Sequence, residues 1–288
     1  MLRPPMWDLA QFTARPLRFP QHYVETWSCS SAPRFAIVTP SLNHDAFITA
    51  TIQSVLDQHY PAVDYLVKDA GSTDGTIAIL QSYGARLRWL SEPDQGQAHA
   101  VNVGFRHVRG ELMAWLNSDD MLAPGSLVAV AKFFQANPEV DLVYGHRIFI
   151  DHGGREIGRA VLPRHDCAAL RRADYVPQES LFWRRRVWER LGGLDESFHY
   201  ALDWDFLLRA QSAGFRIVRL PRFLGCFRIH ERQKTSARLE LGLAEQSVLR
   251  ARWVAPDWTW PDIHGGLARY MLRQHAYQYA WRLGLLRH

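Results

Sequence analysis

The sequence has few cysteines and no long apolar run. Its 288 residues include three cysteines, Cys29, Cys167 and Cys226, which are odd in number, far apart and without metal-ligand spacing. This pattern predicts reduced, buried thiols and excludes a disulfide framework. A membrane span needs about 18 consecutive apolar residues, which no stretch supplies, and prolines break the N-terminal stretch where a signal peptide would have its apolar core. We therefore expect a cytoplasmic protein.

Composition points to an ordinary globular domain with a basic surface. Hydrophobic residues make up 47% of the chain and charged residues 22%, which excludes a disordered or fibrous class. The formal net charge is +5 and the sequence pI is about 9.3, which favours anionic partners such as phosphates or an acidic membrane surface. No nucleic-acid-reading module is recognisable, so we expect no nucleic-acid partner.

Strands and helices alternate through the first half of the chain. Residues 1–33 carry prolines that predict an extended lead-in, and the fold begins at Phe35. "FAIVTP" is a β-branched run ended by proline, and "HDAFITATIQSVLDQ" places apolar residues at helical spacing. The alternation continues to about residue 138. It predicts an α/β fold with a mainly parallel, doubly wound sheet.

After residue 138 the pattern changes to shorter elements. "VDLVYGHRIFIDHGGREIGRA" predicts a hairpin turning at Gly153 and Gly154, and "FRIVRL" and "FLGCFRIH" predict two short strands. From residue 234 the chain is helical and basic. We therefore expect a lead-in (1–33), a catalytic domain (34–233) with halves 34–138 and 139–233, the second carrying a small antiparallel portion, and a C-terminal helical extension (234–288).

Polar residues follow three of the predicted strands. In a doubly wound sheet, ligands bind beyond the carboxyl ends of the strands. Asp119 and Asp120 end the apolar run "ELMAWL", and hard carboxylate oxygens suit Mg²⁺ or Mn²⁺ bound to a diphosphate. The alternative is a solvated turn or helix cap. The residues at these strand ends are Pro40, Ser41, Asn43, Asp69 and 117–120.

A second acidic pair lies in "YALDWDFLLRA". On a helix, Asp203 and Asp205 point about 200 degrees apart, so at most one of them faces the crevice. The functional interpretation is a general base. The alternative is a negatively charged first turn that complements the helix dipole.

Six ordered stretches together resemble a known enzyme family. They are "IVTPSLN", "VKDAGSTDGT", "SEPDQGQAHAVNVGF", "GELMAWLNSDDML", "PQESLFWRRRVWERLGGLDESFHYALDWDFLLR" and "FRIHERQKT". Over roughly residues 35–236 the chain resembles the inverting, family 2 type of nucleotide-sugar glycosyltransferase with the GT-A fold. The resemblance implies metal-dependent sugar transfer from a nucleotide diphosphate sugar, with UDP expected, to a saccharide or lipid-linked hydroxyl acceptor in polysaccharide or glycolipid synthesis.

The resemblance also implies roles for individual residues. Asp203 stands where the family has its catalytic base, although Leu202 precedes it where an acid is common. Metal binding falls to Asp119, Asp120 and His230 with Mn²⁺ or Mg²⁺, because Asn117 replaces the leading aspartate of the motif. A lone histidine also has an ordinary structural interpretation. Lys234 and Thr235 match a stretch that closes over the diphosphate. The implied nucleotide-binding residues are Pro40, Ser41, Asn43, Asp69, Asp94, Gln95, Gln97, Asn102, Asn117 and Ser118.

Aromatic and polar residues of the second half are candidates for the sugar side. Gln178 and Glu179 have side chains that can hydrogen-bond sugar hydroxyls. Aromatic faces suit sugar rings, and core packing is the alternative for each aromatic residue. These aromatic candidates are Phe182, Trp183, Trp188 and Trp204.

The C-terminal stretch mixes arginines with apolar residues. Arg269, Arg273, Arg282 and Arg287 lie among aromatic and aliphatic side chains. One interpretation is peripheral contact with an anionic membrane that carries a lipid-linked acceptor. The other is a helix packed on the catalytic domain or on a second subunit. The oligomeric state stays open.

Other classes fit less well. A sugar-1-phosphate nucleotidyltransferase should have a glycine-rich loop with a basic residue after the first strand, and "TPSLNHDAF" has neither. A haloacid-dehalogenase-like phosphatase needs an aspartate where Gly71 stands. A non-catalytic nucleotide-sugar-binding domain would be expected to lack Asp119, Asp120 or Asp203, and all three are present.

Overall fold

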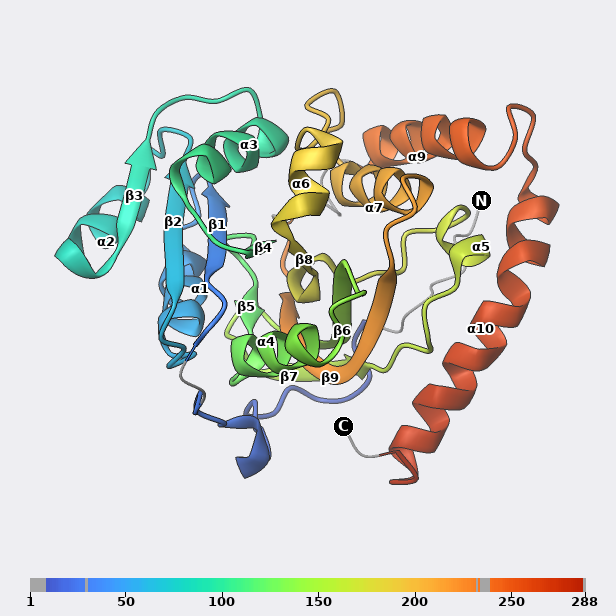
Figure 1. The fold of residues 1–288 in the computed structure, drawn as a ribbon, viewed down its shortest axis with the longest axis horizontal. Coiled ribbons are helices and arrows are strands. Elements are labelled where there is room, and N and C mark those ends of the chain that lie inside the picture. The colour runs from blue at the N-terminus through green and yellow to red at the C-terminus, as the bar shows by residue number, and fades with distance from the viewer. Residues whose placement is uncertain (1–8, 29–30, 232, 234–238, 287–288) are drawn as a thin grey trace.

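The computed structural model describes residues 9–28, 31–231, 233 and 239–286. Its first half is built on four parallel strands in the order β3-β2-β1-β4 (Figure 1). β1 pairs with β2 from Phe35 opposite Val63 to Ser41 opposite Asp69, so both strands end at the same edge. The bounds are β1 (Phe35–Ser41), β2 (Val63–Asp69), β3 (Arg88–Ser91) and β4 (Leu112–Trp115).

Helices cover both faces of these strands. Because successive strand residues point to opposite faces, Phe35 and Ile37 of β1 pack into one core, and Ala36 and Val38 pack into the other. The first core holds α1 (Asp45–Leu56), α2 (Thr76–Ser82) and α4 (Ser126–Ala136); the second holds α3 (Gln97–His107), α6 (Arg185–Leu191) and α7 (Leu202–Ser212). The doubly wound arrangement expected from the alternation is confirmed.

The second half of the sheet is mixed. β4 is followed in the sheet by β8, β6, β9 and β5, and β7 pairs with β6 as the expected hairpin. β8 is antiparallel to both β4 and β6, whereas β9 runs parallel to β6. The bounds are β5 (Met121–Leu122), β6 (Leu142–Ile150), β7 (Glu156–Ala160), β8 (Phe182–Arg184) and β9 (Ile217–Arg228).

β9 corrects one expectation. The two short strands predicted from "FRIVRL" and "FLGCFRIH" form one continuous strand, Ile217–Arg228. Pro221 lies where the register with β6 shifts, since Tyr144 opposes Arg219 and His146 opposes Phe223. A proline has no N–H to donate to a sheet, and a bulge accommodates it without ending the strand.

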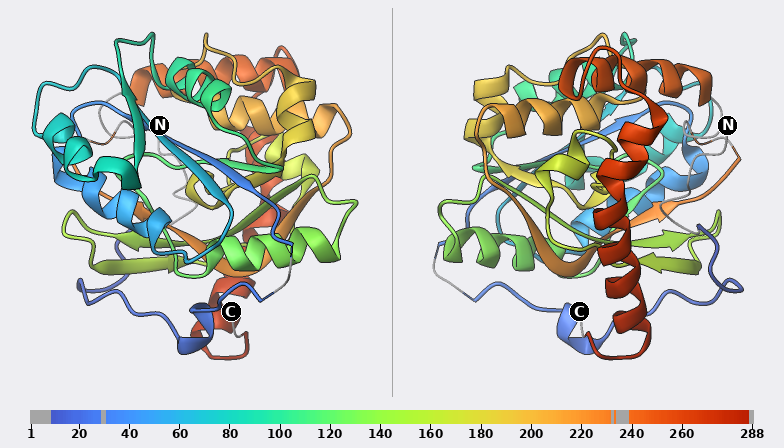
Figure 2. Two further views of the ribbon diagram at one scale, coloured as in Figure 1. Left: turned by 60° about the vertical axis from the view of Figure 1, so that its left-hand side comes forward. Right: turned by 90° about the vertical axis from the view of Figure 1, so that its right-hand side faces the viewer.

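The C-terminal helices pack on elements of the 139–233 half. α9 (Leu239–Trp253) lies near α7, and α10 (Trp260–Arg282) runs along the outside of the molecule, as Figure 2 shows. Ile263, Leu267 and Tyr270 of α10 are buried in the core that contains α5 (Cys167–Leu170). Within the described ranges, no helix is long and apolar enough to cross a membrane.

The structure also contains the short 3-10 turns η1 (Gln21–Tyr23), η2 (Gly84–Arg86) and η3 (Gln178–Ser180).

The cysteines differ in burial. Cys226 is buried as predicted, but Cys167 is exposed, because it is the first residue of the short helix α5 at the surface. Cys29 lies outside the described residues.

Candidate active site

A pocket of about 610 Å³ opens where β1 and β4 end and extends towards α7. Residues from both halves of the sheet line it, and so does Gln246 of α9. Strand ends of the nucleotide half therefore share one cavity with the start of α7. The predicted site residues that line it are Pro40, Ser41, Asp94, Gln97, Asn117, Ser118, Asp119, Asp120, Gln178, Glu179 and Asp203.

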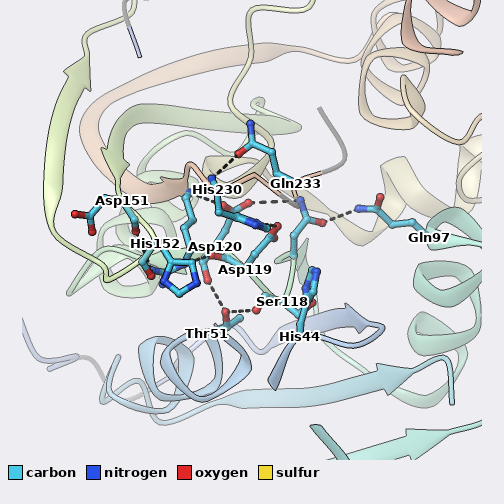
Figure 3. A network of polar contacts seen from close by, with 12 residues as sticks. His44, Thr51, Gln97, Ser118, Asp119, Asp120, Asp151, His152, His230 and Gln233 are labelled. Atoms are coloured by element: carbon cyan, nitrogen blue, oxygen red, sulfur yellow. Dashed lines mark hydrogen bonds and ion pairs between the residues drawn. The ribbon is translucent and has the colours of Figure 1, made fainter. Parts of the chain in front are cut away.

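The acidic loop 117–120 is held from several sides (Figure 3). The Thr51 hydroxyl of α1 lies 2.9 Å from the carbonyl oxygen of Ser118 and 2.7 Å from that of Asp120. Gln97 donates to the Asn117 side chain at 2.7 Å, and His44 Nδ1 lies 2.6 Å from Ser118 Oγ. The loop is thus fixed to α1 and α3 before any ligand arrives.

Asp119 faces His230. Asp119 Oδ2 lies 3.1 Å from His230 Nε2, and the Asp119 side chain is 18% exposed (Figure 3). Burial acts to raise the pKa of Asp119, but the hydrogen bond from His230 and the charges of His44 and His230 outweigh it, so this pKa is lowered. Asp119 is therefore the carboxylate that stays ionised.

Asp120 is turned inward. It is 2% exposed, and its Oδ1 accepts the backbone N–H of Arg228 at 2.9 Å. Burial, with the charges of Asp119 and Glu179, raises the pKa of Asp120 well above its usual range. The surroundings of Asp120 therefore favour its neutral, protonated form.

Asp119 and His230 offer a partial set of ligands for a divalent cation. Among the described residues, no three His, Cys, Asp or Glu side chains converge tightly enough to hold a metal alone. The predicted ligands Asp119, Asp120 and His230 therefore do not form a complete metal site by themselves. Asp120 instead accepts a hydrogen bond from the backbone N–H of Arg228. Mg²⁺ commonly takes only one or two carboxylates and completes its shell with water and phosphate oxygens. The oxygen and nitrogen of the Asp119–His230 pair fit that pattern.

The two acids of α7 have separate surroundings, as their helical spacing predicted. Asp203 lines the pocket, and its Oδ1 accepts the N–H of Trp204 at 2.9 Å. Asp205 is fully buried and accepts from Arg209 Nε at 2.6 Å. Of these two acids, Asp203 lines the pocket and Asp205 does not.

Asp69 organises the strand end below the pocket. It is fully buried; its Oδ2 accepts from the N–H groups of Gly71 and Ser72 at 2.9 Å and from Ser91 Oγ at 2.7 Å. Asn43 accepts the Thr73 N–H at 2.8 Å, which ties the first strand end to the same turn. A contact of Asp69 or Asn43 with a nucleoside stays a prediction, since neither lines the pocket.

A buried lysine, which the sequence reasoning missed, positions Asp94. Lys68 has no exposed surface, and its ammonium donates to the carbonyl oxygens of Asp69 and Glu92 at 2.8 and 2.7 Å. It also lies 4.0 Å from Asp94 Oδ2. A buried lysine needs such partners, and here they join β2 to the turn before α3.

Several predicted residues lie away from the pocket. Asn102 bonds Glu196 Oε1 and both backbone groups of Leu194, and Gln95 is exposed. Glu179, although it lines the pocket, is tied up in two bonds from Arg147 at 2.7 and 2.6 Å. Lys234 and Thr235 lie outside the described residues. The aromatic candidates pack in the core and do not line the pocket, which agrees with the alternative interpretation of core packing. They are Phe182, Trp183, Trp188 and Trp204.

The pocket also contains residues that no sequence pattern pointed to. Asp174 stands in it with one buried carboxyl oxygen that has no hydrogen-bond partner. Burial and the charge of Asp203 raise the pKa of Asp174 well above its usual range, although Arg147 opposes them. A motif search cannot find such a residue, because only the fold brings it beside Asp203. The others are His44, Arg147, Tyr175, His199, Tyr200, Gln233 and Gln246.

Solved structures share this fold. An S. aureus TarS structure (1–349, in complex with UDP-GlcNAc) superposes with a TM-score of 0.62 at 18% identity, covering 86% of this chain and 74% of that chain. A mannosyltransferase from Pyrobaculum calidifontis, in complex with GDP-Man and Mn²⁺, gives 0.59 at 20% identity over 88% and 81%. The expected GT-A fold is therefore confirmed.

Curated relatives match at the sequence level. An O-antigen biosynthesis protein of Myxococcus xanthus is 31% identical over 230 residues, 77% of this chain but 18% of that protein. Chondroitin synthase of Escherichia coli is 28% identical over 66% of this chain and 28% of its own length. A PGL/p-HBAD biosynthesis glycosyltransferase of Mycobacterium bovis is 30% identical over 66% and 74%. The chain thus spans less than a third of the first two relatives.

A family model gives the assignment. The model described as "Glycosyl transferase family 2" matches residues 36–198, which is more than half of the 288 residues and includes β1, the acidic loop and β8. The chain belongs to glycosyl transferase family 2.

Proposed function

We propose that this protein transfers a sugar from a nucleoside diphosphate sugar to a hydroxyl acceptor, with inversion at the anomeric carbon and with a divalent cation. One observation carries the proposal: a single pocket joins the strand ends Pro40 and Asn117 with the side chains of Asp119 and Asp203. The structural neighbours were solved in complex with UDP-GlcNAc in one case and with GDP-Man and Mn²⁺ in the other, which supports this ligand class. We expect uridine as the base.

Asp203 is the proposed general base. A hydroxyl becomes a better nucleophile when a carboxylate takes its proton during attack, and attack from the face opposite the leaving group inverts the anomeric carbon. Asp203 is the acid of α7 that lines the pocket, and the N–H of Trp204 holds its Oδ1. We assign the acceptor proton to this carboxylate.

Asp119 and His230 are the residues that would hold the cation. When bound, Mn²⁺ or Mg²⁺ supplies Lewis-acid stabilisation of the charge on the departing diphosphate. Asp119 contributes an ionised carboxylate, and His230 contributes Nε2 at 3.1 Å from it. Asp120 holds the loop in place by accepting the backbone N–H of Arg228.

The acceptor is proposed to be a saccharide or a lipid-linked saccharide. The relatives are named for O-antigen biosynthesis, chondroitin synthesis and PGL/p-HBAD biosynthesis, which supports this acceptor class. Gln178 and Asp174 line the same pocket as Asp203, and the side chain of each has a buried oxygen without a hydrogen-bond partner. Such oxygens suit sugar hydroxyl donors.

We further propose that α10 rests on an anionic membrane. Leu272, Tyr279 and Leu283 are 71%, 65% and 56% exposed and recur at helical spacing along one side of α10. The exposed Arg269 and Arg282 flank them. The protein has a net charge of +5, and this apolar stripe has arginines on both sides. Such a surface complements an anionic membrane, which is negatively charged at its surface and apolar inside.

Donor binding and turnover test the enzymatic proposal. Thermal shifts are measured with UDP, UDP-GlcNAc and GDP-Man, each with and without Mn²⁺, because a ligand that binds only the native state raises Tm. Wild-type protein should be stabilised by at least one nucleotide, more strongly with Mn²⁺. Asp119→Asn should lose the Mn²⁺-dependent part of the shift.

The base is tested separately. Asp203→Asn should keep the nucleotide-dependent shift but release nucleoside diphosphate from the stabilising donor at least about a hundredfold more slowly. Unchanged release would remove Asp203 as the base. A wild-type protein that none of these nucleotides stabilises, with or without Mn²⁺, would contradict the proposed donor class itself.

A further inference from the structure

Glu245 of α9 binds the chain segment that leads into α7. Its Oε1 accepts the backbone N–H of His199, and its Oε2 accepts those of Tyr200 and Ala201, each at 2.8 Å. Glu245 is 8% exposed, so these bonds are shielded from water. One carboxylate thus satisfies three successive N–H groups.

The bound segment needs this partner. Ala201 is the N-cap of α7 and has no side chain to cap it. Successive N–H groups that point the same way form an anion-binding concavity, and the positive end of a helix dipole strengthens it. Bonds to a charged acceptor are about twice as strong as neutral ones. The carboxylate therefore fixes from α9 the chain segment that enters α7, up to and including the N–H of the N-cap residue Ala201.

Other contacts press α9 against the same place. A Cβ placed on Gly242 would lie 2.8 Å from the Tyr200 ring, so the helix backbone packs directly on that ring. The Arg250 guanidinium lies 5.3 Å from the Trp204 ring of α7, and its Nε donates to the carbonyl oxygen of Arg172 at 2.9 Å. α9 is therefore docked along its length.

The segment leads directly to the reacting end of the pocket. His199 and Tyr200 line the pocket, and Asp203 follows two residues after Ala201. His199 also lies against Gly96 of the nucleotide half, where a Cβ would be 3.3 Å from its ring. A displacement of this segment would move Asp203 relative to a bound donor.

We propose that Glu245 is a positioning residue for Asp203, and that α9 is part of the catalytic unit although it lies outside the family-matched residues 36–198. The inference rests on the proposed role of Asp203 as base. It predicts that the charge and reach of Glu245 control turnover without controlling donor affinity.

The variants are Glu245→Gln, Glu245→Asp and, as matched control, Glu240→Gln, which removes an exposed carboxylate from the same helix. Hydrogen exchange should accelerate at the amides of His199, Tyr200 and Ala201 in Glu245→Gln only. In Glu245→Gln, the kcat for release of nucleoside diphosphate from the donor that stabilises the wild type should fall about 10- to 100-fold, because a small displacement of a catalytic group costs that much. The Kd of UDP with Mn²⁺ should stay within about threefold, because the nucleotide half is untouched.

Glu245→Asp keeps the charge and should recover part of the lost kcat; if Glu245→Gln does not fold, the same measurements on Glu245→Asp decide. Hydrogen exchange and kcat that stay at wild-type values in the Glu245 variants would overturn the proposal. A kcat that falls only in proportion to donor affinity would also overturn it. An inactive Asp203→Asn beside a fully active Glu245→Gln removes the positioning role alone. A fully active Asp203→Asn removes the proposed base and this inference with it.

Discussion

At the scale of single residues, neighbours in the chain receive opposite chemistry from their surroundings. Asp119 is 18% exposed and faces His230, which lowers its pKa despite burial. Asp120 is 2% exposed and bonded to Arg228, and burial raises its pKa. The motif alone left the division of labour between these acids open. Solvation and partners now favour Asp119 as the cation ligand.

His165 carries a pH prediction. Burial lowers its pKa from 6.5 to about 4, although Gln211 and Asp166 act in the opposite direction. Between these pH values the unfolded chain binds a proton that the folded chain does not, so the free energy of unfolding falls as pH drops from 6.5 to 4. The loss should approach roughly 2 to 3 kcal/mol from this residue. Urea unfolding at pH 7 and pH 5 measures most of it.

The comparison variant is His165→Asn, whose amide can still meet the Tyr175 hydroxyl that lies 2.8 Å from His165 Nδ1. It should lose less stability between pH 7 and pH 5 than the wild type does. The exposed His275→Asn serves as control and should behave like the wild type. Identical pH dependence in wild type and His165→Asn would disprove the assignment.

At the scale of elements, close packing of backbones decides which glycines matter. Gly110 lies between α3 and β4, where a Cβ would stand 2.6 Å from the carbonyl oxygen of Arg34 beside β1. Gly265 sits inside α10 with nothing within 4 Å of a Cβ. The same substitution should therefore have opposite effects in these elements.

Gly110→Ala should lower the free energy of unfolding by about 1 to 3 kcal/mol, because the methyl group must displace backbone. Gly265→Ala should raise it by about 0.5 to 1 kcal/mol, since alanine loses less conformational entropy in a helix. Urea denaturation of the two variants beside the wild type checks both signs. A Gly110→Ala protein as stable as the wild type would contradict the packing of this turn on β1.

At the scale of the whole molecule, net charge and exposed apolar surface favour the same partner. The chain carries 34 Lys and Arg against 29 Asp and Glu, and the large exposed apolar side chains include Leu272 and Leu283 of the α10 region. Charge attracts the protein to an anionic surface, and apolar insertion holds it there.

Vesicle co-sedimentation tests this. Wild-type protein should bind equimolar phosphatidylcholine–phosphatidylglycerol vesicles, bind phosphatidylcholine vesicles weakly, and be released by salt. A Leu272→Glu, Leu283→Glu double variant should bind at least about tenfold more weakly, because two buried leucine side chains are lost from the interface.

The control is Val248→Glu, which changes an apolar side chain 52% exposed on α9 and should leave binding unchanged. Wild-type protein that ignores anionic vesicles at low salt would reject the membrane proposal. Self-association that the double variant abolishes would assign the stripe to a second copy of the chain.

The sequence predicted those features that local patterns carry. Apolar periodicity located α1 and α7. The helical angle between Asp203 and Asp205 implied that at most one of them faces the crevice, and Asp203 alone of the two lines the pocket. The ordered motifs indicated the family that the comparisons show. Two local predictions were wrong because of tertiary contacts. β9 pairs with β6 on both sides of Pro221 and so forms one strand where two were predicted, and Cys167 lies at the surface where a buried thiol was predicted.

By itself, then, the sequence determined the order of the elements, the polar strand ends and the family, because each depends on residues close together in the chain. Only the tertiary structure decided which of Asp119 and Asp120 stays ionised, where Asp174 stands, and what holds the segment before Asp203. Glu245 binds that segment from 44 to 46 residues away along the chain. No local pattern records such a contact, since burial and hydrogen bonding between distant segments arise only once the chain is folded.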